Sequence, residues 1–538
     1  MGVSWFLIFV VLFVVFKLSA SFFHQSRSHL PFPPGPKRIP FLGNIANAIS
    51  RRKAGTHQWA HYLELSRKYQ SDVVHIDILG DHIIILNSVK ATNEILEKRS
   101  GLYSSRPPMH MHRDLVGWHW NFATMPYTSK WRLHRRIFHQ DFQSQAIAIY
   151  EPIILQSCSD FLKKLVPTDH NLSFEVPDIE HEDLDGYVRN HAGSVILRAV
   201  YGMKTREEID DYVVLVGLAA PSVLETMNHG SFFVDHFPLL KYLPAWLPGT
   251  SFKNKAKAWA PTVSNLVNSP WEKFKSAFLS GASSTCVAAK NFEKFNLVAG
   301  STNTSKESDI DIEEIIRNTA GIAYFAGSDT TVSLLMSSLF ALSHHPEVQK
   351  KAQNELDMAI GHDRLPNFSD RHNLPYIEAI LKEAQRMFPV TPLALPHCSV
   401  SDDIYEGYFI PKGSVIIGNV WAILHDQETY HDPMHFNPDR FMGEKSTLPP
   451  DPELYAFGFG RRVCPGRHFA LQSAWIVIAS VLATCNIMKP HSDDSNDKID
   501  LVEDFADGLV MHPKPFKCCI TPRSPIALKL MTAGYSTM

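Results

Sequence analysis

The chain has 538 residues, 45% of them hydrophobic, and can therefore bury a large core. Its 52 basic and 55 acidic residues give a formal net charge of −3, which offers no electrostatic support for nucleic-acid binding. The seven cysteines are odd in number and irregularly spaced, a pattern typical of a reduced, cytosol-facing protein rather than a disulfide scaffold.

The first 23 residues are predominantly apolar and about long enough to cross a bilayer. A cleaved signal peptide is the alternative, with Ser19-Ala20-Ser21 as a small-residue cleavage site. Basic residues follow the segment rather than precede it, which favours a retained anchor with the body in the cytosol. We therefore expect a membrane anchor over 1–23, a proline-rich hinge over 24–40 and one large domain over 41–538.

Three glycosylation sequons make this orientation testable. They begin at Asn171, Asn303 and Asn367. A body that faces the cytosol leaves all three unmodified.

β-Branched runs predict two hairpins in a body that is otherwise helical in character. Residues 73–79 and 82–86 flank a Gly-Asp turn, and a helix over 89–98 follows. Residues 408–410 and 415–417 flank the turn at 411–413 and predict the second hairpin. The expected fold class is mainly α with a smaller β-rich region.

Two segments carry large apolar residues without a helical period. Residues 107–127 include several tryptophans and methionines, which favours the lining of a binding pocket over simple core. Residues 231–249 are apolar and broken by prolines, so they cannot form a continuous helix. This second segment is either a loop that dips into a membrane or an internal hydrophobic loop.

A basic stretch follows the first of these segments. Residues 130–136 read KWRLHRR, with Trp131 and Arg135 four positions apart on one helical face. Arg132 and Arg136 fit a solvated basic face, which can also steer a negatively charged partner.

A long helix is expected from Asp309 to about Ser343, since its first turn is acidic. Within it, residues 326–331 read AGSDTT, and a glycine with two adjacent threonines is a poor choice for a helix interior. Such a local violation often marks function, although a helix-packing threonine pair is the alternative. Further along, Glu383 and Arg386 are spaced to share one helical face, which alone is a weak signal.

The stretch 457–466 reads FGFGRRVCPG and is followed by an apolar helical segment. Its glycines allow positive φ angles and close approach to a flat ligand. Arg461, Arg462 and the N-terminus of the following helix favour the thiolate form of Cys464. A buried cysteine acting as a small hydrophobe is the alternative.

These four motifs, in this order, resemble those of the cytochrome P450 superfamily. The cysteine loop fills every fixed position of the pattern F-x-x-G-x-R-x-C-x-G. The stretch 326–331 is similar to the family's A/G-G-x-D/E-T-T/S motif, and 131–135 and 383–386 match its W-x-x-x-R and E-x-x-R signatures. The resemblance covers nearly the whole chain and implies the cytochrome P450 fold with an N-terminal transmembrane helix.

The resemblance also implies a haem b cofactor whose iron takes Cys464 as its axial thiolate. Many fungal relatives place Arg after the histidine near position 397, where this chain has Cys398, so only His397 is carried over as a propionate partner. The implied cofactor-binding residues are Cys464, Trp131, Arg135, His397, Phe457 and Arg462.

For catalysis, the resemblance implies that Thr330 offers a hydroxyl at the oxygen site and that Asp329 feeds protons from solvent. Gly327 would leave room for dioxygen. Glu383, Arg386 and Arg440 would form a buried charge network that locks the segment before the cysteine loop.

The activity implied is insertion of one oxygen atom of O2 into a lipophilic small molecule, as hydroxylation or further oxidation. Electrons would come from NADPH through a separate reductase, with cytochrome b5 as a further partner, at the endoplasmic reticulum membrane. Details such as Trp-Arg-x-His-Arg-Arg resemble fungal secondary-metabolism enzymes of the O-methylsterigmatocystin oxidoreductase type, so we expect a terpenoid substrate. Polyketide, aromatic and alkaloid substrates are alternatives. A haem-thiolate isomerase or dehydratase and a haem sensor or carrier are also alternatives, although none of these needs a proton relay.

Overall fold

The computed structural model describes residues 30–535 apart from 41, 54, 167–177, 228–230, 248, 283–284, 296, 298–310, 491–498 and 502. Over these ranges the chain is mainly helical with three small sheets, as the sequence predicts. The predicted anchor at 1–23 and two of the sequons lie outside the described residues. Within the described part, one helix, Ile312–His344, is long and apolar enough to cross a membrane; 72% of its most apolar window is buried, as in a core helix.

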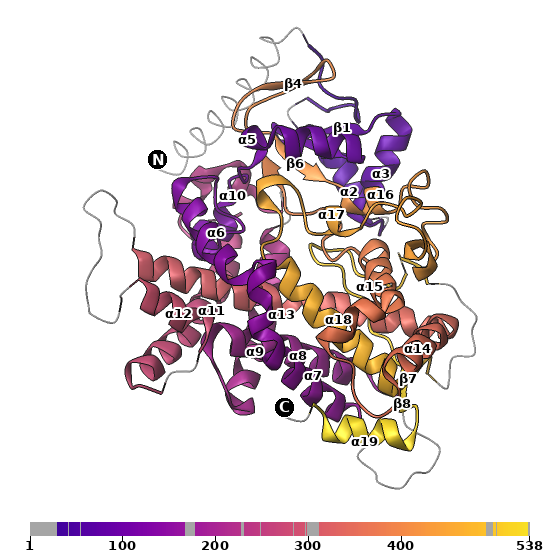
Figure 1. The fold of residues 1–538 in the computed structure, drawn as a ribbon. Helices are drawn as coiled ribbons and strands as arrows, with labels where there is room; N and C mark the ends of the chain where they lie inside the picture. The colour runs from indigo at the N-terminus through magenta and orange to yellow at the C-terminus, as the bar shows by residue number, and fades with distance from the viewer. Residues whose placement is uncertain are drawn as a thin grey trace.

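That helix, α13 (Ile312–His344), runs through the middle of the molecule (Figure 1). The Asp311 side chain caps it by accepting a hydrogen bond from the Glu314 N–H at 3.2 Å. It packs against α8 (His181–Tyr201), α11 (Phe252–Leu279) and α18 (Arg467–Thr484). Because it is apolar on all sides, it is stable only when surrounded in this way. The predicted long helix is confirmed.

The largest sheet has four strands in the order β1-β2-β6-β3. β1 (Val73–Ile78) and β2 (Asp81–Leu86) form the first predicted hairpin, which is confirmed. β6 (Val415–Gly418) lies parallel to β2 and antiparallel to β3 (His397–Cys398). The indigo N-terminal strand β1 and the orange strand β6 therefore belong to the same sheet in Figure 1, with β2 between them.

The second predicted hairpin is wrong. β5 (Tyr408–Ile410) pairs with β4 (Asp403–Tyr405) through a two-residue turn, and not with β6. Glu406 and Gly407 have φ angles of 48° and 82°, and positive φ at both positions gives the turn that matches strand twist. Residues 411–413 instead connect two different sheets.

The remaining elements surround this frame. In the N-terminal half they are α2 (Ile45–Lys53), α3 (Gln58–Tyr69), α4 (Val89–Thr92), η1 (Asn93–Lys98), α5 (Ser100–Tyr103), η2 (Met111–Leu115), η3 (Trp118–Trp120), α6 (Ser129–Phe142), η4 (Ser144–Tyr150), α7 (Glu151–Lys164), α9 (Arg206–Thr226), α10 (Phe233–His236) and η5 (Pro238–Tyr242). In the C-terminal half they are α12 (Val287–Lys294), α14 (Pro346–Ile360), η7 (Phe368–Asn373), α15 (Pro375–Met387), α16 (Val420–Leu424), η8 (Pro438–Phe441), α17 (Glu453–Ala456), η9 (Gly460–Arg462), β7 (Cys485–Met488), β8 (Cys519–Pro522) and α19 (Pro525–Ala533).

The two apolar segments behave differently. The large apolar residues between 109 and 125 are buried, apart from Leu115, which is partly buried. In the second segment α10 and η5 interrupt the chain, so a continuous helix is indeed absent there. Phe233, Tyr242 and Trp246 are 63%, 75% and 74% exposed, which contradicts an internal loop. Insertion of this segment in a membrane stays a prediction.

Candidate active site

The loop that carries Cys464 is folded tightly against the first third of the chain. The Cys464 N–H donates to the Phe457 carbonyl at 2.8 Å, and Gly458 and Gly460 have φ angles of 79° and 57°. A Cβ on Gly460 would lie 2.2 Å from the Leu96 carbonyl oxygen. At Gly460 glycine is therefore required by the close approach to the backbone of η1, and the predicted approach of this loop to a flat ligand stays a prediction.

Opposing effects act on the pKa of the Cys464 thiol. Burial raises its pKa, while the backbone N–H groups at the start of α18 and the charges of Arg135 and Arg467 act in the opposite direction. Arg461 donates to the Tyr127 hydroxyl at 2.7 Å, and an effect of its charge on the thiolate stays a prediction.

Arg462 of the same loop is held in a buried site, and its predicted effect on the thiolate also stays a prediction. Its guanidinium donates to the carbonyl oxygens of Ser104, Phe122 and Met125 at 2.8, 3.3 and 2.7 Å. It lies 4.1 Å from the ring centroid of Trp131, a cation–π contact. The structure thus brings together two residues that the sequence places in different motifs.

Three arginines converge here without a carboxylate. Arg106 is 6% exposed and donates to the Ala123 carbonyl at 2.9 Å and to those of Leu395 and Pro396 at 2.7 Å. Burial lowers its pKa to about 9. Burial, with repulsion from Arg106 and Arg135, lowers the pKa of Arg462 to about 8.

In the part of the chain that the structure describes, the hydrogen bonds of Arg106 and Arg462 go to carbonyl oxygens alone, and Arg135 forms no ion pair with a carboxylate. Buried cations are normally paired with an anion. A dianionic group fits this site, and the two propionates of haem have that charge. Arg106 was missed by the sequence analysis because a single arginine in an apolar segment gives no pattern.

His397 lies beside the same arginines. It is 3% exposed, and its Nδ1 is 2.7 Å from the Tyr103 carbonyl oxygen. Since a carbonyl only accepts, Nδ1 carries the hydrogen. Burial holds the pKa of His397 well below its usual value, and Arg106 and Arg462 lower it further. In the neutral imidazole, Nε2 has no hydrogen to donate to a carboxylate, so the predicted role requires a second proton on this ring.

α13 stays helical through the predicted threonine motif but is more exposed there. Ala326 is exposed, although residues 318–325 directly before it on the helix are all buried, and Thr330 is partly exposed. The Thr330 hydroxyl donates to the Ala326 carbonyl at 2.8 Å. A Cβ on Gly327 would lie 3.2 Å from Ile196 of α8, so this glycine allows the two helices to pack closely. That packing is a different reason from the room for dioxygen that the sequence suggested.

Asp329 points to two cations that the sequence analysis did not find. Its Oδ1 lies 2.9 Å from Arg189 Nη1, and its Oδ2 lies 3.4 Å from His512 Nε2. Burial by itself would raise the pKa of Asp329, but His512 and Arg189 outweigh it and hold the pKa at about 2.

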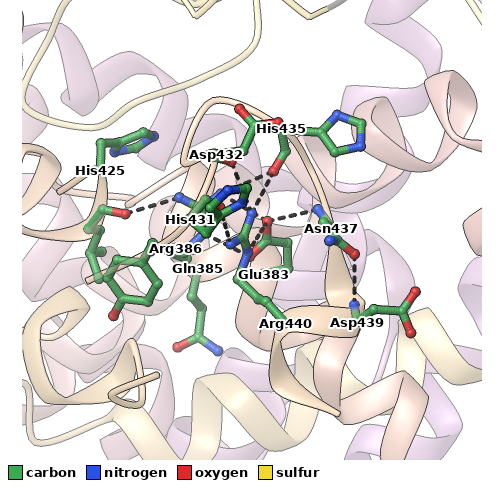
Figure 2. Close-up of polar contacts among 12 residues, drawn as sticks. Glu383, Gln385, Arg386, His425, His431, Asp432, His435, Asn437, Asp439 and Arg440 are labelled. Atoms are coloured by element: carbon green, nitrogen blue, oxygen red, sulfur yellow. Dashed lines mark hydrogen bonds and ion pairs between the residues drawn. The ribbon is translucent and has the colours of Figure 1, made fainter. Parts of the chain in front are cut away.

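The predicted charge network is confirmed and is drawn in Figure 2. Arg386 donates to both oxygens of Glu383 at 2.7 and 2.8 Å, and Arg440 reaches the same carboxylate at 3.0 Å. The Asn437 N–H donates to it at 2.8 Å. Glu383 and Arg386 have fully buried side chains. This network holds the segment around η8 against α15 ahead of the cysteine loop.

This helical fold and its arginine-lined cysteine loop are those of a haem-thiolate protein, and the sequence model described as Cytochrome P450 matches residues 33–520. The chain belongs to the cytochrome P450 family. Membership implies a haem-thiolate iron, and the enzyme is an oxidoreductase of the monooxygenase class.

Three relatives that show this similarity over nearly the whole chain are fungal. A cytochrome P450 monooxygenase of Armillaria gallica is 40% identical over 508 residues, with 94% of each chain covered. Cytochrome P450 monooxygenase 98 of Postia placenta is 37% identical and covers 96% of this chain and 95% of its own. A tryptamine 4-monooxygenase of Psilocybe cyanescens is 34% identical, with 97% of this chain and 99% of its own covered.

Proposed function

We propose that the enzyme inserts one oxygen atom of O2 into a lipophilic small molecule, with Cys464 as the axial ligand of haem b. The observation that supports haem binding is a group of three arginines beside the cysteine loop that have no carboxylate partner among the described residues: Arg106, Arg135 and Arg462. They would hold the two propionates, with Trp131 packed on Arg462. Phe457 fixes the loop by accepting the Cys464 N–H.

Bound haem supplies oxygen activation by two electrons and two protons. The residues of the chain itself orient the reacting groups and deliver the protons. Thr330 would present its hydroxyl where α13 is more exposed, and it can exchange the Ala326 carbonyl for a new acceptor. Asp329, one residue before it, would pass protons toward that hydroxyl.

Electrons would come from NADPH through a separate reductase, with cytochrome b5 as a second donor. Arg132, Arg136 and Arg461 are exposed on the side of α6 and of the cysteine loop, and they would steer an acidic partner. The exposed aromatic residues of the segment 231–249 support attachment to the endoplasmic reticulum membrane by a surface in addition to the predicted anchor.

The substrate we propose is a terpenoid of fungal secondary metabolism. The buried tryptophans and methionines of 109–125 support a hydrophobic substrate. The tryptamine 4-monooxygenase acts, by its name, on an aromatic amine, so tryptamine is the second candidate.

The test is turnover under labelled oxygen. The full chain, in microsomes with a fungal NADPH–cytochrome P450 reductase, is given a cyclic sesquiterpene hydrocarbon, tryptamine or 7-ethoxycoumarin under ¹⁸O2. One ¹⁸O atom in the product, or for the ether one ¹⁸O in the released aldehyde, supports monooxygenation. NADPH-independent conversion without label would instead support an isomerase or dehydratase.

A further inference from the structure

We propose that His512 holds the proton that Asp329 passes on, and that it takes this proton from solvent. This inference rests on the proposed function and deepens it at the same site. Because His512 acts through Asp329 rather than on the substrate, it is a positioning and proton-supplying residue.

The geometry gives each oxygen of Asp329 one cationic partner. Arg189 Nη1 lies 2.9 Å from Oδ1, and His512 Nε2 lies 3.4 Å from Oδ2. Arg189 is in turn fixed by Asp185, whose Oδ2 is 2.5 Å from its Nε. The carboxylate is therefore held between a rigid partner on α8 and a histidine from the C-terminal segment.

Of the two partners, only the histidine can release a proton. Burial alone would lower the pKa of Arg189, but the carboxylates of Asp185 and Asp329 raise it, so this arginine keeps its proton, whereas histidine as a residue type exchanges its proton near neutral pH. With both cations beside it, the pKa of Asp329 is about 2, so the carboxyl group itself stores almost no proton at neutral pH. The proton that Asp329 passes on must then be held by a neighbour.

His512 is placed firmly, yet its ring reaches solvent. Its side chain is 25% exposed, compared with 16% for Asp329. The preceding residue, Met511, is fully buried; its N–H donates to the Val390 carbonyl at 2.9 Å, and its carbonyl accepts from the Ser333 hydroxyl of α13. The backbone is thus anchored directly before His512, while the imidazole lies between solvent and the Asp329 carboxylate.

Other charged groups face His512 from the packed elements. α13 contributes Asp329, and the start of α8 contributes His181, Asp185 and Arg189. Two carboxylates attract the imidazolium, whereas Arg189 and a protonated His181 repel it. Histidine as a residue type loses its proton as the pH rises through the neutral range, so the proposal predicts that proton supply falls with rising pH.

The step moves one proton and no electrons. The N–H bond at His512 Nε2 breaks as an O–H bond forms at Asp329 Oδ2, and that proton then leaves toward the Thr330 hydroxyl. The free lone pair on Nε2 accepts a proton from bulk water. The two electrons of each turnover come separately from the reductase.

The test compares His512→Gln with a matched control. Gln keeps a side-chain N–H for Asp329 but cannot release its proton. His362 provides the control, because its Nδ1 is also 3.4 Å from a carboxylate, that of Asp357, which likewise binds an arginine, Arg523. Product, hydrogen peroxide and NADPH are measured with 7-ethoxycoumarin between about pH 6 and pH 9, and with hydrogen peroxide in place of NADPH and O2.

We expect His512→Gln to form about 10- to 100-fold less product per NADPH than the parent, since a positioned acid contributes at least that much. The product yield of His512→Gln should depend less on pH than that of the parent, and its peroxide-driven turnover should persist. When Asp329→Asn is already present, adding His512→Gln should cause no further loss of product yield. His362→Gln should match the parent throughout. Unchanged yield and pH profile in His512→Gln would overturn the proposal. Loss of peroxide-driven turnover as well would show a merely structural role, and an inactive parent under both conditions would refute the proposed function itself.

Discussion

Replacing Arg462 by methionine separates the role of this residue in folding from its role in holding an anion. The change removes a buried cation and keeps a long apolar side chain. The pKa of Arg462 falls from 12.5 to about 8, which at 1.36 kcal/mol for each unit corresponds to about 6 kcal/mol of unfavourable burial together with repulsion from Arg106 and Arg135. Its three hydrogen bonds to carbonyl oxygens offset about 1.5–3 kcal/mol each. These contributions nearly cancel in the cofactor-free chain.

With haem bound, the balance changes because a propionate supplies the missing anion. Removing one partner of a desolvated charge pair costs about 2–5 kcal/mol, which corresponds to about 30-fold to several thousand-fold in affinity. We therefore expect Arg462→Met to change the free energy of unfolding of the cofactor-free chain by less than about 2 kcal/mol and to weaken haem binding by at least about 30-fold.

Urea unfolding measures the first quantity, and the rate of haem transfer to excess apomyoglobin measures the second. Arg461→Met is the matched control, because Arg461 is the residue next to Arg462 but is exposed, so its substitution leaves the anion site intact. Equal haem retention in the parent and in Arg462→Met, or a stability loss that is the same with and without haem, would refute the reasoning.

Three further predictions concern other parts of the chain. Glu383→Gln leaves Arg386 and Arg440 buried without their anion and should lower the free energy of unfolding by about 3–5 kcal/mol. Urea unfolding of the haem-loaded protein measures this change. A loss below about 1 kcal/mol would be incompatible with this network. Asp329, with a pKa lowered from 3.8 to about 2, adds about 2 kcal/mol of stability above pH 4 that is lost as the pH falls toward 2. Acid unfolding of Asp329→Asn should lack this component, and parallel curves for both proteins would contradict it. Asn367, which caps η7 with its side chain, should carry no glycan, so a mass shift on glycosidase treatment of the natively expressed protein would disprove the cytosolic orientation.

The parts of the fold that the sequence predicts are those encoded by local spacing. The i,i+3 pair Glu383 and Arg386 forms its ion pair within one helix, and the motif on α13 stands out because glycine and threonine are unusual there. Both depend on residues within a few positions of each other, so a single helical period is enough to find them.

Long-range partners could not be predicted in this way. Arg106 and His512 reach the site from segments far apart in the chain, and each is an ordinary residue in its own surroundings. The pairing of β6 with β2 joins strands more than 300 residues apart, and the local turn at 411–413 wrongly suggested a hairpin. The signal that could have corrected it is Glu406-Gly407, a two-residue turn sequence between two short β-type runs.

The most direct test of the haem-thiolate assignment is the spectrum of the reduced, carbon monoxide-treated protein, with Cys464→His as the comparison. If Cys464 is the axial ligand, the parent absorbs at about 450 nm and Cys464→His loses this band in favour of one near 420 nm, about the position for imidazole ligation. A band at about 450 nm that survives the substitution, or its absence from the haem-loaded parent, would contradict the assignment of Cys464 as the iron ligand.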